Sequence, residues 1–312
     1  MRYAVISDIH GNLPALEAVL ADCALQGVDD FLFLGDYYGD FPFVNEVLDL
    51  VRAAGGHAIL GNKETRMLET YGKPQTPLQF SPLSWNLAHI RADNLRWLES
   101  LPQTLSLPMG SRLCRLAHAS AQFLDCRAIE TVRGDSPIFT NGDTAAAANA
   151  DAYSRYAARL LAADADFCRA LRDVPGDVFL FGHFHVQWYA EIEGNLLLNP
   201  GSCGLPLDFD GNAAYAILDA ESLAVTLRRV PYDRTLPVRA LRESDFYDVA
   251  PLWHELCLLE FAHIRCFVQP FLRFAEALAR ERNAPIHPFA NDLWQEALCL
   301  YTEKLRKEGK MA

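Results

Sequence analysis

The chain opens on a short apolar run that ends in polar side chains: residues 3–12 read YAVISDIHGN. Residues 3–6 have the length and composition of a buried β-strand. Asp8 and His10 follow that strand, and residues 13–25 then carry apolar side chains at a helical period. A strand, a polar turn and a helix in this order are typical of α/β proteins, in which ligands gather beyond the carboxyl ends of the strands.

The same alternation continues outward from this stretch. Residues 30–34 and 57–60 predict two more strands, and residues 43–54 predict a helix between them. Strand–helix–strand units indicate a parallel sheet with helices on its faces, because a parallel pair needs a long crossover connection. Helices are also expected within residues 65–101 and 144–171, and strands at residues 105–107, 113–117, 177–181, 186–192, 196–198, 213–218 and 223–230.

Five polar clusters each stand directly after a predicted strand. They are Asp8-Ile9-His10, Gly35-Asp36, Gly61-Asn62, His118 and Gly182-His183-Phe184-His185. Each has an ordinary explanation when taken alone, as a helix cap, a turn or a pair of surface histidines. Because all five follow strands, they predict one shared site at the rim of the sheet.

The residue types of these clusters suit divalent metal ions. Carboxylates and imidazoles bind hard or borderline cations, whereas a cage of thiolates is absent from the five clusters. A carboxylate such as Asp36 can bridge two ions. Two ions about 3.5–4 Å apart can hold an attacking hydroxide, bind phosphoryl oxygens and stabilise the charge that develops during in-line displacement. The clusters therefore indicate a two-metal hydrolase.

On these motifs the sequence resembles the calcineurin-like metallophosphoesterases, in particular their small bacterial phosphodiesterase-like branch. The resemblance is carried by Asp8-Ile9-His10-Gly11-Asn12, Gly35-Asp36-Tyr37-Tyr38-Gly39, Gly61-Asn62-Lys63-Glu64, His118, Gly182-His183-Phe184-His185 and Asn199-Pro200-Gly201-Ser202. These motifs lie within residues 1–230, in the order in which the family has them. The resemblance implies a four-layer αββα sandwich, in which two mixed β-sheets are flanked by helices.

The resemblance also implies roles for the site residues. Asp8, His10 and His185 would hold one divalent ion, Asn62, His118 and His183 would hold a second, and Asp36 would lie between them. A metal-bridging hydroxide would attack phosphorus, and Asn12 would help to orient the site. The identity of the two ions stays open among manganese, iron, zinc, nickel and magnesium.

Lys63 departs from the family pattern, which commonly has histidine at this position. Lysine can bind a phosphate oxygen, but its ordinary pKa of about 10.4 makes it a poor proton donor unless nearby cations lower that pKa. Two roles stay open for Lys63, a phosphate contact and a solvated residue at a helix start. The departure favours cleavage of phosphodiesters over that of monoesters.

Composition narrows the choice of partners and of compartment. The formal net charge of -12 argues against bulk binding to nucleic acid or to an anionic membrane, but two metal ions would still attract a small phosphorylated substrate. The eight cysteines include no CxxC pair, which indicates reduced thiols and a cytoplasmic location. Neither a signal peptide nor a membrane span is expected. On the loop after His118, two roles stay open for Arg127 and Arg133: they bind the anion of the substrate, or they are solvated surface residues.

The sequence changes character after residue 231. Residues 243–308 lose strand signals and predict helices, so we expect a metallophosphoesterase domain over residues 1–235 and a helical appendage over residues 236–312. Packing or homo-oligomerisation is the expected role of the appendage. The leading hypothesis is a dinuclear phosphoesterase. The alternatives are a scaffold that has kept the fold without catalysis, which Lys63 and the appendage would suit, and a protein Ser/Thr phosphatase.

Overall fold

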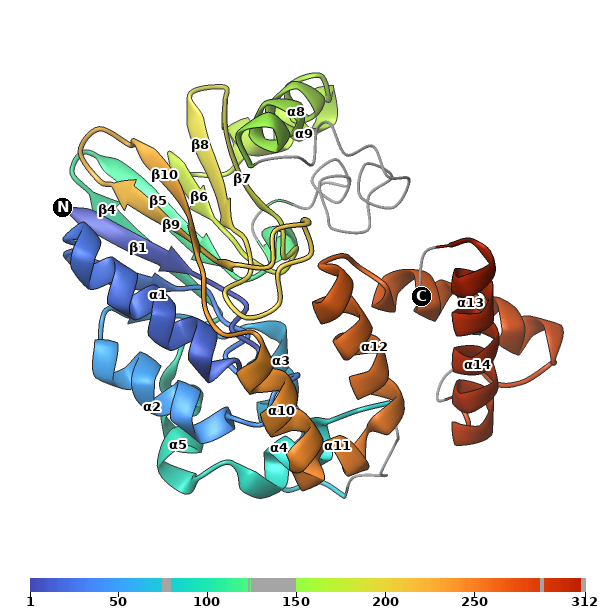
Figure 1. The fold of residues 1–312 in the computed structure, drawn as a ribbon. Helices are drawn as coiled ribbons and strands as arrows, with labels where there is room; N and C mark the ends of the chain where they lie inside the picture. Colours follow the sequence, from blue (N-terminus) through green and yellow to red (C-terminus); the bar gives the residue numbers. More distant parts are fainter. Residues whose placement is uncertain (75–79, 123, 125–149, 287–288, 310–312) are drawn as a thin grey trace.

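The computed structural model describes residues 1–74, 80–122, 124, 150–286 and 289–309. Ten strands form two sheets within these residues (Figure 1). The strands are β1 (Arg2–Ile6), β2 (Asp30–Phe33), β3 (His57–Ala58), β4 (Thr104–Met109), β5 (Arg112–Ala117), β6 (Val178–Leu180), β7 (Gln187–Ile192), β8 (Asn195–Pro200), β9 (Ala213–Asp219) and β10 (Val225–Val230).

Helices cover the outer faces of the sheets and form the C-terminal part of the described chain (Figure 1). They are α1 (Leu13–Gln26), α2 (Val44–Ala54), α3 (Asn62–Thr70), α4 (Leu83–His89), α5 (Ala92–Ser100), the 3-10 helix η1 (Ser120–Gln122), α8 (Ala150–Ala162), α9 (Ala165–Asp173), α10 (Thr235–Glu243), α11 (Asp245–Val249), α12 (Pro251–His263), α13 (Val268–Glu281) and α14 (Asn291–Lys307). Residues 144–149 of one predicted helical stretch, and Arg127 and Arg133, lie outside the described residues.

The two sheets are both mixed. In the first, with strand order β10-β9-β1-β2-β3, strands β1, β2 and β3 are parallel, whereas β9 pairs antiparallel with β1 and with β10. In the second, with order β4-β5-β6-β8-β7, strands β5, β6 and β8 are parallel, and antiparallel β4 and β7 form the edges. The parallel strands of the two sheets supply the carboxyl ends at which a site can form.

An apolar layer lies between the sheets, where alternate residues of the strands meet. Val5, Leu32, Leu116 and Leu180 belong to this buried cluster, as the period of two in a strand requires. On the outer face of the first sheet, α1 and α2 pack over the strands, and α8 packs on β7 of the second sheet (Figure 1). The fold is therefore the four-layer αββα sandwich that the resemblance implies.

The loops that follow the parallel strands are joined by backbone hydrogen bonds. The amides of Ile9 and His10 both donate to the carbonyl of Asp36, at 2.8 and 3.0 Å. A Cβ on Gly35 would lie 2.3 Å from the amide nitrogen of Gly61, so only glycine lets these two loops approach so closely. The loops after β1, β2 and β3 thereby form one continuous platform at the rim of the sheet.

The C-terminal helices begin earlier than predicted, at Thr235 rather than near residue 243. Asp233 accepts hydrogen bonds from the amide and the hydroxyl of Thr235, and Pro237 fits in the first turn, where its missing amide hydrogen is not needed. Leu241 of α10 and Phe261 of α12 belong to the apolar cluster that also contains α1 and the first sheet. Helices α13 and α14 pack together at the far right of Figure 1 and contact α12.

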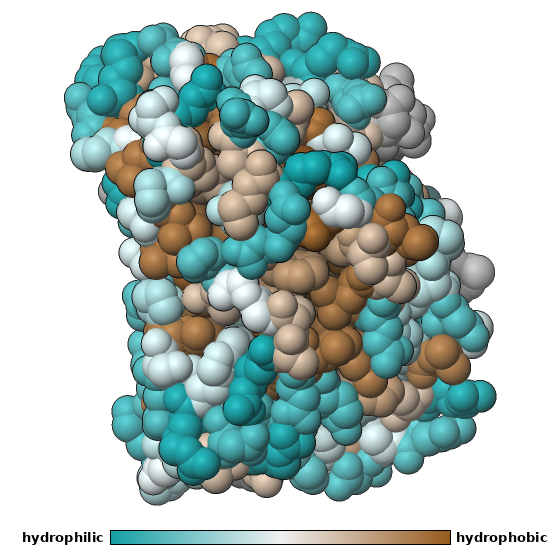
Figure 2. Space-filling view, turned by 90° about the vertical axis from the view of Figure 1, so that its left-hand side faces the viewer, coloured by the Kyte–Doolittle hydropathy of each residue, from teal (hydrophilic) through white to brown (hydrophobic). Residues whose placement is uncertain are grey.

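The surface mixes polar and apolar residues. On the face shown in Figure 2, hydrophobic residues gather mainly toward the middle of the molecule and hydrophilic residues cover its ends. Leu25 is exposed over 84% of its surface, an isolated apolar residue of the kind common on proteins. Every helix of the described residues is too short or too polar to span a lipid bilayer.

Candidate metal centre

The residues predicted as metal ligands lie at the ends of parallel strands from both sheets. Asp8 follows β1, Asp36 follows β2, Asn62 begins α3 after β3, His118 follows β5, and His183 and His185 stand between β6 and β7. The structure brings these six residues and His10, the seven predicted ligands, to the rim where the two sheets meet. Their role as ligands stays a prediction, but their convergence is a property of the fold.

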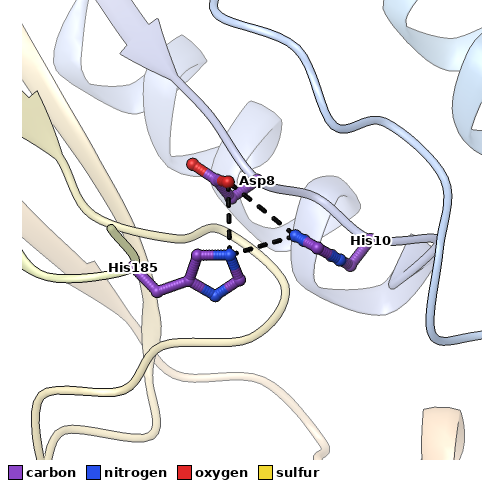
Figure 3. Close-up of side chains that lie close together, drawn as sticks. All are labelled: Asp8, His10 and His185. Atoms are coloured by element: carbon purple, nitrogen blue, oxygen red, sulfur yellow. Dashed lines mark hydrogen bonds and ion pairs between the residues drawn. The ribbon is translucent and has the colours of Figure 1, made fainter. Parts of the chain in front are cut away.

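One group consists of Asp8, His10 and His185, whose side chains turn toward one another (Figure 3). Oδ1 of Asp8 lies 3.2 Å from Nε2 of His185 and 3.8 Å from Nε2 of His10. The two Nε2 atoms lie 3.1 Å apart. One carboxylate oxygen and two ring nitrogens therefore surround a point at which a single cation would contact all three.

A second group lies beside the first and shares Asp8 with it. Nε2 of His118 is 3.5 Å from Oδ2 of Asp36 and 3.9 Å from Oδ1 of Asp8. Oδ1 of Asn62 lies 3.0 Å from Nε2 of His118 and 2.9 Å from Nδ1 of His183. Asp36 also approaches the first group, because its Oδ2 is 3.8 Å from Nε2 of His10. This position between the groups suits a bridging carboxylate.

Hydrogen bonds at the far side of each ring decide which nitrogen faces the site. Nδ1 of His185 lies 2.7 Å from the carbonyl oxygen of Leu205, and Nδ1 of His118 lies 2.8 Å from that of Leu34. Since a carbonyl only accepts, each Nδ1 carries hydrogen, and in the neutral ring Nε2 presents a lone pair to the site. Oδ1 of Asp8 is buried and receives no hydrogen bond from any described residue. Acceptors thus face acceptors, and a metal cation fits this donor set.

The electrostatic field of the site favours positive charge. Burial disfavours an imidazolium, but Asp40 and Asp8 outweigh it and raise the pKa of His10 to about 10. Burial is likewise outweighed by Asp36 and Asp8, which raise the pKa of His118 to about 9. The same carboxylates that favour protons on these rings would attract divalent cations.

The backbone is left-handed at five of the predicted ligands. The φ angles are 54° at Asp8, His10 and Asp36, 70° at His183 and 56° at His185. Such conformations cost about 1 kcal/mol or more for residues other than glycine, and they cluster at functional sites. Here they turn each chain sharply after its strand, so that side chains separated in sequence point at one another.

Lys63 lies at the start of α3 and lines the cavity beside the two groups. Its Nζ stands 5.0 Å from the centre of the Trp253 ring, and the side chain is partly buried rather than solvated. Burial opposes its charge, but Asp40 and Asp36 together raise the pKa of Lys63 above its ordinary value. Lys63 therefore carries its positive charge at neutral pH beside the two groups.

Asn12 has its side chain fully engaged in bonds that join loops. Its Oδ1 accepts from the amide of Ala15 at 3.3 Å, which caps α1. Its Nδ2 donates to the carbonyl of Gly204 at 2.8 Å and to the hydroxyl of Tyr232 at 3.0 Å. Asn12 thus fastens the loop after β1 to the chain near residue 204, and its role in orienting the site stays a prediction.

We expect Asn12→Ala to lower the free energy of unfolding by about 2 kcal/mol, because it removes a helix cap and two buried hydrogen bonds. Metal affinity should change less than stability does. Urea unfolding and Mn²⁺ titration of this variant measure both. The control is Asn195→Ala at the start of β8, where the side-chain amide donates to the carbonyl of Glu193 in an exposed bond. Unchanged stability with lost turnover would instead assign Asn12 to the chemistry.

Two acidic residues at the site carry no role in the sequence-based prediction. Oε2 of Glu64 accepts from the amides of Asp36 and Gly61, and Oε1 accepts from that of Tyr37, all at 2.9 Å. Oδ2 of Asp40 lies 2.6 Å from Nδ1 of His10. The three-residue spacing from Gly61 to Glu64 is typical of a helix start and could have indicated the role of Glu64. Spacing gives no comparable signal for Asp40.

A cavity of about 230 Å³ opens beside the two groups. Its walls include His10, Asp36, Asn62, Lys63 and His183 from the sandwich, and Trp253, Cys257 and Glu260 from helix α12. A helix of the predicted appendage therefore helps to enclose the site. Sequence reasoning assigned these C-terminal residues no part in it.

Comparison with known proteins adds a family to this geometry. The family model described as the calcineurin-like phosphoesterase superfamily domain matches residues 1–223. An uncharacterized protein of Methanocaldococcus jannaschii is 28% identical over 255 residues, which cover 74% of this chain and 87% of that protein.

Solved structures with a similar fold include the following two. A metallophosphoesterase from Sphaerobacter thermophilus superposes with a TM-score of 0.60 at 24% identity, covering 84% of this chain and 99% of its own. A hypothetical protein from Pyrococcus horikoshii gives a TM-score of 0.58 at 18% identity, covering 81% of this chain and 97% of its own. At these identities the similarity concerns the fold alone.

Proposed function

The chain belongs to the calcineurin-like phosphoesterase superfamily, and from this premise we propose that it hydrolyses a small phosphate ester with the help of two divalent metal ions. Asp8, His10 and His185 would hold one ion, and Asn62, His118 and His183 the other, with Asp36 between them. The observation that supports this proposal most is the set of ring nitrogens and carboxylate oxygens that face one another across 3.1–3.9 Å, with the Nδ1 atoms of His118 and His185 held on the far side by carbonyl oxygens.

Two such ions would supply a nucleophile at neutral pH and neutralise charge on the phosphoryl group. The side chains then have separate tasks. Leu34 and Leu205 carbonyls keep the rings of His118 and His185 turned with Nε2 inward. Lys63, held charged by Asp40 and Asp36, would bind a phosphoryl oxygen in the cavity that it lines. Trp253 and Phe184 supply aromatic surface to the walls of the cavity.

The cavity supports a small substrate. About 230 Å³ is below the usual 300–1,000 Å³ of sites for drug-sized ligands, so it suits a phosphoryl group with a small substituent. A charged Lys63 assists binding more than it assists departure of a leaving group, which favours diesters with good leaving groups over monoesters. Turnover of bis-(p-nitrophenyl) phosphate by protein stripped with EDTA and reloaded with Mn²⁺ tests the proposal. Stripped protein that neither binds Mn²⁺ nor regains turnover would favour the scaffold alternative.

Lys63→Ala should raise the KM for this diester about 10-fold while bound metal stays unchanged, because a charged hydrogen bond to phosphate is lost but no predicted metal ligand is. Steady-state kinetics and elemental analysis of purified protein measure the two quantities. Lys307→Ala, at an exposed position of α14, controls for a general loss of positive charge.

Lys63→His adds a second comparison. If the native lysine limits proton donation to leaving groups, this variant should increase turnover of p-nitrophenyl phosphate relative to that of the diester. Unchanged kinetics in both Lys63 variants would place this side chain outside substrate binding.

A further inference from the structure

Helix α12 lies outside the residues matched by the family, yet it closes one side of the cavity. The family model ends at residue 223, whereas Trp253, Cys257 and Glu260 of α12 line the cavity together with His10. Glu260 has a structural task, since its Oε1 accepts from the amides of Phe267 and Val268 at 2.7 Å. Trp253 and Cys257 instead contact a residue of the loop between β2 and α2, residues 34–43, which we call the site loop.

That residue is Asp40, a carboxylate that is 1% exposed. Its Oδ2 lies 2.6 Å from Nδ1 of His10. Its Oδ1 accepts from Nε1 of Trp253 at 2.6 Å and from Sγ of Cys257 at 3.4 Å. Asp40 therefore has one oxygen on a predicted metal ligand and the other on helix α12, and the bond to Trp253 joins residues 213 positions apart.

The contact to His10 has a defined physical effect. A carboxylate beside Nδ1 keeps hydrogen on that nitrogen, which leaves Nε2 to face Asp8 and His185, and it makes the ring a stronger base. A buried carboxylate is itself costly unless donors satisfy it. The indole N–H of Trp253 satisfies one oxygen of Asp40 and so fixes the direction in which the other oxygen points.

We propose that Asp40 is a positioning residue that couples helix α12 to metal binding, by holding His10 in its metal-binding orientation while Trp253 holds Asp40. The inference rests on the metal site of the proposed function. By thermodynamic linkage, a metal ion at His10 should in turn stabilise the packing of α12 against the site loop.

Trp253→Phe is the most selective change available. Phenylalanine keeps an aromatic face beneath Nζ of Lys63 and against Phe80, but it removes the indole N–H that Asp40 accepts. Trp85→Phe is a matched control, because Nε1 of Trp85 donates to Oδ1 of Asp245 at 2.8 Å in a similar bond away from the cavity. Asp40→Asn and Asp245→Asn form the second matched pair.

The experiment is a calorimetric titration of full-length, EDTA-stripped protein with Mn²⁺. Loss of an outer partner of a metal-binding histidine typically weakens affinity by about 10–100-fold. We expect Kd to rise by about 10-fold in Trp253→Phe and by up to about 100-fold in Asp40→Asn, and to stay within about twofold in Trp85→Phe and Asp245→Asn. Thermal unfolding of each stripped variant verifies that it is folded.

Hydrogen exchange gives a readout that does not depend on turnover. Mn²⁺ should slow exchange of the amides of α12 in the parent, and it should slow them less in Trp253→Phe. If the parent and all four variants bind Mn²⁺ with the same affinity, the proposed coupling between α12 and metal binding is wrong, while the proposed function stands. If the parent binds no Mn²⁺, both are wrong. Should Asp40→Asn fail to fold, the pair of tryptophan variants decides.

Discussion

Asp36→Asn is expected to lower Mn²⁺-dependent hydrolysis of bis-(p-nitrophenyl) phosphate by about 10³-fold or more, since it removes charge stabilisation where the phosphoryl group reacts. Oδ1 of Asp36 accepts from the amide of Lys63 at 2.9 Å, and Oδ2 faces Nε2 of His118 at 3.5 Å. The carbonyl of asparagine would keep the first bond. Its NH₂ group must then point at the site, where it places hydrogen atoms in the position that suits a bridging cation.

The measurement combines turnover with metal content, so that lost chemistry can be told from lost metal. His118→Ala should have a similar effect, since it removes a nitrogen that faces both Asp36 and Asp8. Asp22→Asn serves as the control, because Asp22 pairs with Arg228 and Tyr215 away from the cavity and should affect stability alone. Equal rates in the parent, Asp36→Asn and His118→Ala would refute the two-metal proposal.

The fold could be predicted from residues that stand next to one another. Apolar runs such as residues 3–6 and 30–34, separated by helical periods, predict parallel strands, and β1 and β2 do pair in parallel. Asp8, Asp36 and Asn62 follow successive parallel strands, so their meeting at one rim follows from the fold class. For this reason the site predicted from the sequence lies where the structure brings the seven residues together.

The directions in which those side chains point could not be predicted from the sequence. The left-handed backbone at Asp8, His10 and Asp36 is unfavourable locally, and it persists because the loop amides of Ile9 and His10 bond to the carbonyl of Asp36. Local propensity opposes this conformation, so only the tertiary hydrogen bonds reveal it. The same holds for Asp40 and Trp253, whose contact joins distant segments and has no periodic signature.

The C-terminal helices show the same limit on a larger scale. Loss of strand signals after residue 231 correctly predicts helices, but periodicity does not say what their apolar faces cover. Four of those residues, Leu241, Phe246, Leu258 and Phe261, are buried in the cluster that contains α1 and the first sheet. Phe261 packs against Phe41 of the site loop, with ring centres 5.1 Å apart.

A chain that ends at residue 235 is therefore expected to be unfolded or strongly destabilised. Deletion of a buried leucine or phenylalanine side chain costs about 2–5 kcal/mol. The summed cost of losing all four side chains is therefore as large as the total free energy of unfolding, which is usually about 5–15 kcal/mol. Far-UV circular dichroism and urea unfolding of the shortened chain, beside the full chain, measure the effect.

A chain that ends at residue 265 separates the contribution of α10–α12 from that of α13 and α14. It keeps the four core side chains and Trp253, and it exposes the face of α12 that carries Leu256 in the cluster with Phe271. We expect this longer chain to fold with reduced stability and to keep its affinity for Mn²⁺ within about 10-fold, because Asp40 retains its partner. Cooperative unfolding of the chain ending at residue 235, at the midpoint of the full chain, would instead show that residues 1–235 fold independently. Helices α10–α12 would then be dispensable to the core, despite the side chains they bury in it.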